Sequence, residues 1–200
     1  MTVNDFKKDY LRQYCLIEKD FINTIDYVSI SNSNYSTFSH TYLKILLSIG
    51  SEVDVLKNLI SELLGTEWKK FNSKEPDFHT IEVEVKSYDI ILKPWESNSN
   101  PKWWTAYNEV KHNRNECAKS FDSSRKYFEY ANLENVITAL AGLYSLELLA
   151  YKIVADSNGD KVFIPNIHSI FQLKNLYWAN TSNGSGYLII DECLYLNEIL

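Results

Sequence analysis

Apolar residues recur at three- and four-residue steps over two stretches in the first third of the chain. This spacing predicts two long amphipathic helices. The first is expected over about residues 4–27, and a polar break at residues 29–36 follows it. The second is expected to begin after Ser39, a suitable N-cap residue, and to end at Gly65, where a C-terminal glycine is favoured.

The pattern changes to strict alternation of apolar and charged residues at residues 80–86, which predicts a half-buried strand. Residues 88–93 continue this strand or form a second one after a turn near Ser87. Residues 96–101 are an expected loop, with Asn100 as the cap and Pro101 as the first residue of a third helix. The helices are therefore interrupted by a small β insertion within residues 76–96.

A fourth helix, at about residues 133–154, is apolar nearly all round, which is typical of a buried central helix. Short strand-like segments at residues 162–164 and 187–190 predict an appended hairpin or an extra sheet. The fold class predicted for the single domain 1–200 is mainly α. It consists of an up-and-down bundle of four to five helices (about 4–155), a β insertion with strands at about 80–93, and a β-containing C-terminal appendage (156–200).

The composition is that of an ordinary soluble globular protein, with 45% hydrophobic and 23% charged residues. No run of about 18 apolar residues and no signal-peptide pattern is found, so neither a membrane span nor secretion is expected. Three cysteines far apart, Cys15, Cys117 and Cys193, predict no disulfide framework and favour a cytoplasmic location. The formal net charge of -6 disfavours a general nucleic-acid coat, although residues 101–126 carry six basic against three acidic side chains.

One acidic segment invites comparison with a calcium loop, because Asp156, Asn158 and Asp160 alternate as its ligands do. Lys161 and Ile167 stand where that loop needs a glycine and a bidentate glutamate. The segment is therefore interpreted as a helix terminator. No metal site and no cofactor is expected.

The third helix carries the candidate chemistry. A helical wheel at 100° per residue places Arg114 on the apolar stripe of Trp103 and puts His112 on the opposite face. A buried arginine needs a carboxylate, and Glu147 is the acid in the middle of the apolar fourth helix, so a structural Arg114–Glu147 ion pair is predicted. On the outer face His112 is either an incidental solvated residue or a working imidazole.

The third helix contains Trp104-x-x-Tyr107-Asn108-x-Val110-Lys111-His112-x-Arg114, and a helix rich in small residues follows at 131–140. This segment resembles a branch of the HEPN superfamily, which comprises helical domains of bacterial toxins, defence systems and RNA-processing enzymes. The resemblance implies a four- or five-helix bundle that often dimerises. It places the family's asparagine on Asn108 and its histidine on His112, while Tyr107 occupies the usual arginine position.

In catalytic members of that superfamily the histidine acts on the attacking 2'-hydroxyl of RNA and the arginine steadies the phosphate, without a metal. The resemblance thus implies RNA as a partner and a homodimer formed through the third helix. Asn108, Lys111 and His112 would line a shared groove, with Lys111 or Arg114 standing in for the missing arginine. Trp104 and Lys102 are the candidate substrate contacts. The alternatives are a non-catalytic dimerisation or protein-interaction module and a small-molecule pocket walled by Trp103, Trp104 and residues 81–92.

Overall fold

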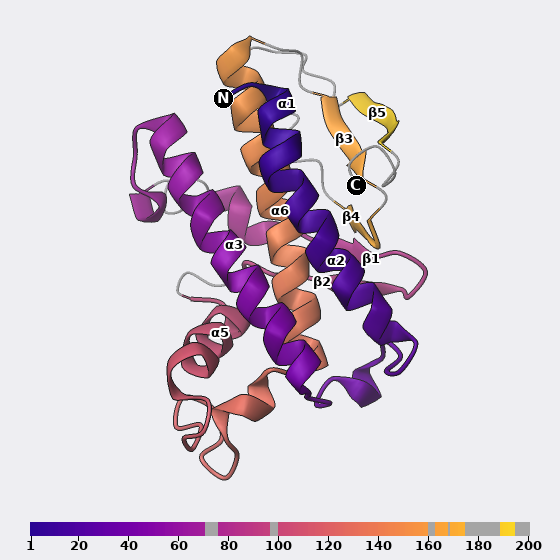
Figure 1. Cartoon of the computed structure of the whole chain (residues 1–200), viewed down its shortest axis with the longest axis vertical. Coiled ribbons are helices and arrows are strands. Elements are labelled where there is room, and N and C mark those ends of the chain that lie inside the picture. Colours follow the sequence, from indigo (N-terminus) through magenta and orange to yellow (C-terminus); the bar gives the residue numbers. More distant parts are fainter. Residues whose placement is uncertain (71–75, 97–99, 160–162, 168, 175–188, 195–200) are drawn as a thin grey trace.

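The protein is mainly α-helical, with a helical bundle and small β elements as predicted (Figure 1). The computed structural model describes residues 1–70, 76–96, 100–159, 163–167, 169–174 and 189–194. The helices that build the bundle are α1 (Val3–Phe6) and α2 (Arg12–Ile25), joined through a π-helical turn (Lys7–Leu11), then α3 (His40–Leu64), α5 (Lys102–Asn113) and α6 (Leu133–Asn158).

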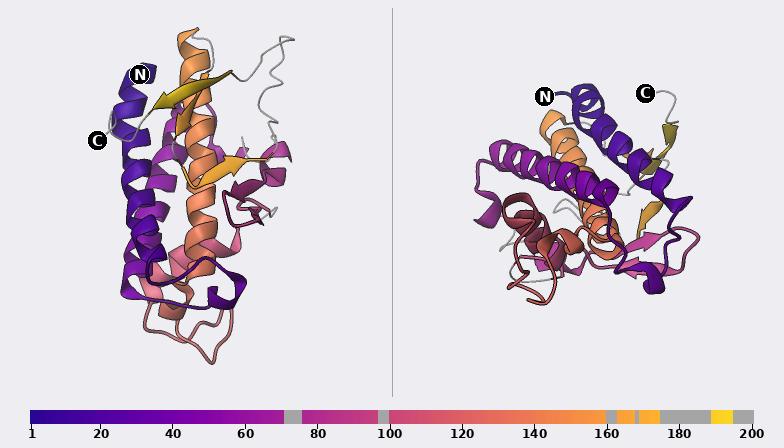
Figure 2. Two further views of the ribbon diagram at one scale, coloured as in Figure 1. Left: turned by 90° about the vertical axis from the view of Figure 1, so that its right-hand side faces the viewer. Right: turned by 60° about the horizontal axis from the view of Figure 1, so that its bottom comes forward.

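Helix α6 is the centre of the bundle, and α2 and α3 lie against it in the views of Figures 1 and 2. Its side chains are buried on every face, because its sequence is apolar nearly all round. Length and composition alone would let α6 cross a membrane, but 89% of its most apolar window is buried inside the bundle. It extends four residues beyond the predicted end and stops at Gly159, whose φ of 70° suits a glycine.

The caps predicted for the second helix are confirmed. The Ser39 side chain accepts a hydrogen bond from the backbone N–H of Tyr42 at 3.0 Å, and Gly65 ends α3 with a φ of 59°. The third helix begins one residue later than predicted, because Pro101 is its N-cap and Lys102 its first residue. These local features define the two ends of α3 and the start of α5.

The predicted β insertion is a short hairpin of β1 (Val83–Val85) and β2 (Ile90–Leu92), in which Val83 pairs with Leu92. Its turn uses two residues with positive φ, Ser87 and Asp89. A third strand, β4 (Phe171–Leu173), pairs with the free side of β1 in antiparallel orientation. This joins the C-terminal region to the insertion, which the sequence pattern did not predict.

The C-terminal strands β3 (Phe163–Ile167) and β5 (Ile189–Leu194) pair with each other in parallel. Of the two arrangements predicted for this region, the extra sheet is therefore correct and the hairpin is wrong, because a two-strand hairpin is antiparallel. Residues 162, 187 and 188 of the predicted strands lie outside the described residues.

A buried glutamate of α2, Glu18, connects this helix to the residues directly before β4. The Oε1 atom of Glu18 accepts hydrogen bonds from the Tyr14 hydroxyl (2.9 Å), the Ser169 hydroxyl (2.6 Å) and the backbone N–H of Ile170 (3.0 Å). Burial raises the pKa of Glu18, and these three bonds act in the opposite direction. The cluster fixes the strand that completes the three-stranded sheet.

Candidate nucleic-acid interface

Helix α5 ends at Asn113, so Arg114, which the helical wheel placed on its apolar stripe, is the C-cap residue. The chain turns after the helix, with the backbone N–H of Glu116 donating to the Asn113 carbonyl at 2.8 Å. It then folds back, and the backbone N–H of Phe128 donates to the Arg114 carbonyl at 2.9 Å. Apolar spacing continues through this turn, which is why the helix end could not be recognised from periodicity.

The predicted Arg114–Glu147 ion pair is also wrong. Arg114 is the exposed C-cap residue of α5 and lies beside Phe128, before α6 begins. Glu147 lies fourteen residues into α6, roughly 20 Å along the axis from Leu133. Its side chain is 0% exposed, and neither carboxylate oxygen has a hydrogen-bond partner among the described residues.

Tyr107, at the position where the family resemblance implies an arginine, is a core residue. Its side chain is 2% exposed, and its ring occupies the space in which a side chain on Gly50 would lie. A Cβ at Gly50 would overlap the Tyr107 ring, so the glycine is what allows α3 and α5 to come this close. An arginine at this position would bury its charge against α3, which is costly without a partner. An uncharged tyrosine therefore suits this site better.

Three cationic or titratable side chains are exposed at the C-terminal end of α5: Lys111, His112 and Arg114. Lys111 donates through Nζ to the Tyr107 hydroxyl at 3.2 Å, and no ion pair involves any of the three within the described part of the chain. Because the carbonyls at a helix C-terminus carry partial negative charge, this is a favourable place for cations. The structure therefore leaves His112, Lys111 and Arg114 exposed in the last turn of α5, with the Lys111 ammonium directed back to Tyr107.

Asn108, the other residue of the family motif, is half-buried one turn before His112. Its side-chain amide donates to the backbone carbonyl of Trp104 at 2.9 Å. Its amide oxygen, which accepts none of the hydrogen bonds within the described residues, can still accept one from a ligand.

The two predicted substrate contacts already have partners inside the protein. Lys102 forms an exposed ion pair with Glu134 at 2.8 Å. The Nζ of Lys57 lies 3.5 Å from the ring centre of Trp104, and burial lowers the pKa of that lysine to about 8. Trp103 is only 1% exposed and donates to the Pro94 carbonyl at 2.7 Å, so it is a core residue rather than a pocket wall.

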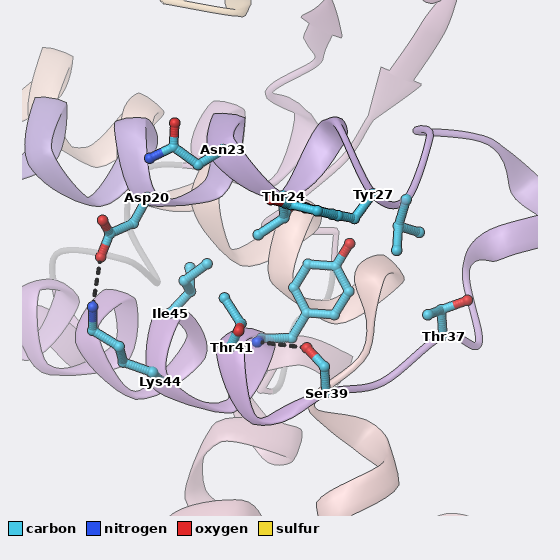
Figure 3. Close-up of a pocket in the computed structure, with 11 residues that line it drawn as sticks. Asp20, Asn23, Thr24, Tyr27, Thr37, Ser39, Thr41, Lys44 and Ile45 are labelled. Carbon is cyan, nitrogen blue, oxygen red and sulfur yellow. Dashed lines mark hydrogen bonds and ion pairs between the residues drawn. The ribbon is translucent and has the colours of Figure 1, made fainter.

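A second feature, a cavity of about 420 Å³ between α2 and the start of α3, was not predicted from the sequence (Figure 3). Its lining is scattered over residues 20–45 and follows no motif spacing. Comparison with known proteins adds no assignment, because no family model, no curated protein and no solved structure matches this chain.

Proposed function

We propose that this protein is a HEPN-like helical bundle that binds RNA through the C-terminal turn of α5. The observation that carries the proposal is the exposed group Lys111, His112 and Arg114, in which neither Lys111 nor Arg114 forms an ion pair with a described carboxylate. Exposed basic side chains that form no ion pair of their own are available to the phosphates of a polyanion. The resemblance of this segment to HEPN proteins supports RNA as that polyanion.

The chemistry of cleavage depends on a cation close to His112. Tyr107 is buried and cannot supply it, whereas Arg114 is exposed at the end of the helix rather than held in the core. A metal-independent attack by a 2'-hydroxyl requires an imidazole and a cation that reach the same phosphate. In this proposal, His112 is the acid–base group, and Arg114 or Lys111 is the phosphate contact.

Binding is tested by the fluorescence anisotropy of a labelled single-stranded RNA over a range of salt concentrations. The double variant Lys111→Ala/Arg114→Ala is expected to weaken binding at least tenfold and to reduce the salt slope by about 1.4, since each phosphate contact to a single strand contributes about 0.7. The matched control is Lys8→Ala/Lys19→Ala, which removes the same charge from exposed positions in the π-helical turn and in α2. Equal losses in both double variants would contradict a site on α5.

Cleavage is tested separately with His112→Ala. This change is expected to abolish any RNA cleavage while leaving RNA affinity within about threefold, because Lys111 and Arg114 remain. Cleavage that persists in this variant would show that His112 is not the acid–base group.

The buried Tyr107 favours one alternative, a non-catalytic homodimer or protein-interaction module that has kept the fold without the active arginine. Sedimentation equilibrium distinguishes it from the first proposal. A dimer that binds no RNA would support this module.

A further inference from the structure

A lysine of α3 ends among three tryptophan rings. The Nζ atom of Lys57 lies 3.5 Å from the ring centre of Trp104 on α5, 5.7 Å from that of Trp95 and 5.8 Å from that of Trp68. Trp68 follows the end of α3, and Trp95 follows β2. This tryptophan cluster (Trp68, Trp95 and Trp104) therefore joins three separate parts of the chain on the side where α3 packs against α5 (Figure 1).

The tryptophan cluster is positioned by the core rather than by the lysine. Trp95 is 4% exposed, and its indole N–H donates to the hydroxyl of Ser145 on α6 at 2.8 Å. Its ring centre lies 6.3 Å from that of Trp68 and 5.3 Å from that of the buried Trp103. Trp103 in turn lies 5.5 Å from Trp104. The rings thus support one another independently of Lys57.

The Lys57 amine has no polar partner in the part of the chain that the structure describes. It forms none of the ion pairs and none of the hydrogen bonds between described residues, whereas Lys44 on the same helix pairs with Asp20 at 2.9 Å. The faces of the indole rings attract an ammonium, but they replace none of the acceptors that water offers its three N–H groups. Part of the hydration of the amine is therefore lost without a substitute.

This loss of hydration favours the neutral amine. Burial lowers the pKa of Lys57 to about 8, while the negative charge of Asp54, three residues earlier on α3, acts in the opposite direction. At pH 7.4 about a fifth of the molecules then carry a neutral amine, against about one in a thousand for a lysine with the ordinary pKa of about 10.4. A neutral lysine in apolar surroundings is the form that proteins use as a nucleophile toward carbonyl groups.

The surroundings of Lys57 also select the kind of electrophile. Lys57, Trp68 and Trp104 are each only partly buried, so this side of the cluster reaches the surface. Indole rings favour contact with a flat, apolar ring over contact with a strongly hydrated group. An acyl group would turn the amine into a neutral amide, whereas a protonated imine keeps a positive charge beside the Trp104 ring. The site therefore suits an aldehyde better than an acylating compound.

We propose that Lys57 is a reactive amine that binds an aromatic aldehyde covalently, with the ring of the aldehyde against the tryptophan cluster. The lone pair of the amine forms a bond to the carbonyl carbon. The carbonyl oxygen then takes up the two amine protons and leaves as water, and an imine remains. The step needs neither an oxidant nor a reductant, and addition of water reverses it. This site goes beyond the proposed RNA binding and does not depend on it.

The proposal is tested by treating the full chain with benzaldehyde and sodium cyanoborohydride, which reduces an imine to a stable amine. Peptide mass spectrometry then gives the rate of labelling at each lysine. At pH 7.5 Lys57 is expected to react at least tenfold faster than the exposed Lys44 of the same helix. The ratio of the two rates is expected to fall below about threefold at pH 10, where a lysine in water also becomes neutral. Equal rates at pH 7.5, or a ratio that does not change with pH, would overturn the proposal.

Three variants and a second aldehyde sharpen the test. Lys57→Arg keeps a cation beside Trp104 but cannot form the imine, so the fast adduct should disappear; an equally fast adduct elsewhere would overturn the assignment. Asp54→Asn removes the charge that favours the protonated amine and is expected to raise the rate at Lys57 about twofold at pH 7.5. Asp20→Asn, the matched control, removes the partner of Lys44 and should leave the rate at Lys57 unchanged. The preference for Lys57 should be larger with benzaldehyde than with propanal; equal preference would overturn the contact between the aldehyde ring and the cluster.

Discussion

Glu18 and Glu147 are both buried in this bundle, at 2% and 0% exposure, yet their surroundings differ. Glu18 accepts three hydrogen bonds from Tyr14 and from residues 169 and 170, and these bonds tie α2 to β4. Glu147, in the middle of α6, has none within the described residues. The comparison shows that burial of the same side chain either organises the fold or only destabilises it, depending on whether donors are present.

The largest effect is expected from removing the organised carboxylate. Glu18→Ala leaves the Ile170 N–H and one hydroxyl without an acceptor, because the Tyr14 and Ser169 hydroxyls, 2.9 Å apart, can satisfy only one of their two donors between them. We therefore expect the free energy of unfolding to fall by about 3–5 kcal/mol. Urea denaturation followed by circular dichroism measures this change. Glu18→Gln keeps an acceptor oxygen and should lose less than half as much; equal losses would mean that packing, not hydrogen bonding, holds β4.

Removing the other carboxyl is expected to have the opposite sign. Glu147→Leu replaces a buried group that has no partner with an apolar one of similar size, and we expect a gain of about 1–3 kcal/mol at neutral pH. The same denaturation experiment measures it, with Glu147→Gln as the variant that keeps shape and polarity. A loss of stability in the leucine variant would show instead that the Glu147 carboxyl makes a favourable interaction in the folded protein.

The pH dependence sharpens the contrast. Burial, and to a smaller degree the nearby Glu52, raises the pKa of Glu147 well above its usual value, so the folded protein keeps this proton longer than the unfolded chain does. Retention of this proton therefore favours the folded state. The favourable effect is fully present below the unfolded pKa of about 4.3 and is lost as the pH rises through the folded pKa. We expect the advantage of Glu147→Leu over the native protein to grow from pH 5 to pH 8, by at most about 1.4 kcal/mol per pH unit. A constant difference would mean that Glu147 does not titrate differently in the two states.

The smallest effect on stability is expected at the surface. His112→Ala should change the free energy of unfolding by less than about 0.5 kcal/mol, because the ring is exposed and makes no hydrogen bond to a described residue. Thermal melts of His112→Ala and Glu18→Ala under the same conditions compare the loss of melting temperature at a surface residue with the loss at a buried one. A loss of more than about 1 kcal/mol in His112→Ala would assign the imidazole a structural role instead.

Features that depend on neighbours in sequence were predicted correctly. The stripe of α3 with its Ser39 and Gly65 ends, the alternation around Val83 and the apolar α6 all follow from local pattern. The end of α5 at Asn113 could not be predicted, because Cys117 and Phe121 continue the helical spacing through a turn.

Contacts between distant residues were not predicted either. The bond from Ser169 to Glu18 joins positions 151 residues apart, and the cavity around Tyr42 depends on how α2 and α3 approach each other. Neither leaves a period or a motif in the sequence. Exposure of His112 on the outer face was predicted, whereas the core position of Tyr107 became interpretable only once Gly50 was seen opposite its ring.

The strand order β2-β1-β4 also has a consequence for the timing of folding during synthesis. At typical ribosomal rates, roughly 8–30 s separate the translation of Glu18 from that of Ser169. During that interval the carboxylate lacks its donors Ser169 and Ile170, and β1 has only β2 beside it. The nascent chain therefore holds an unfinished sheet until its last quarter emerges, which is the period in which a chaperone would have the most to protect.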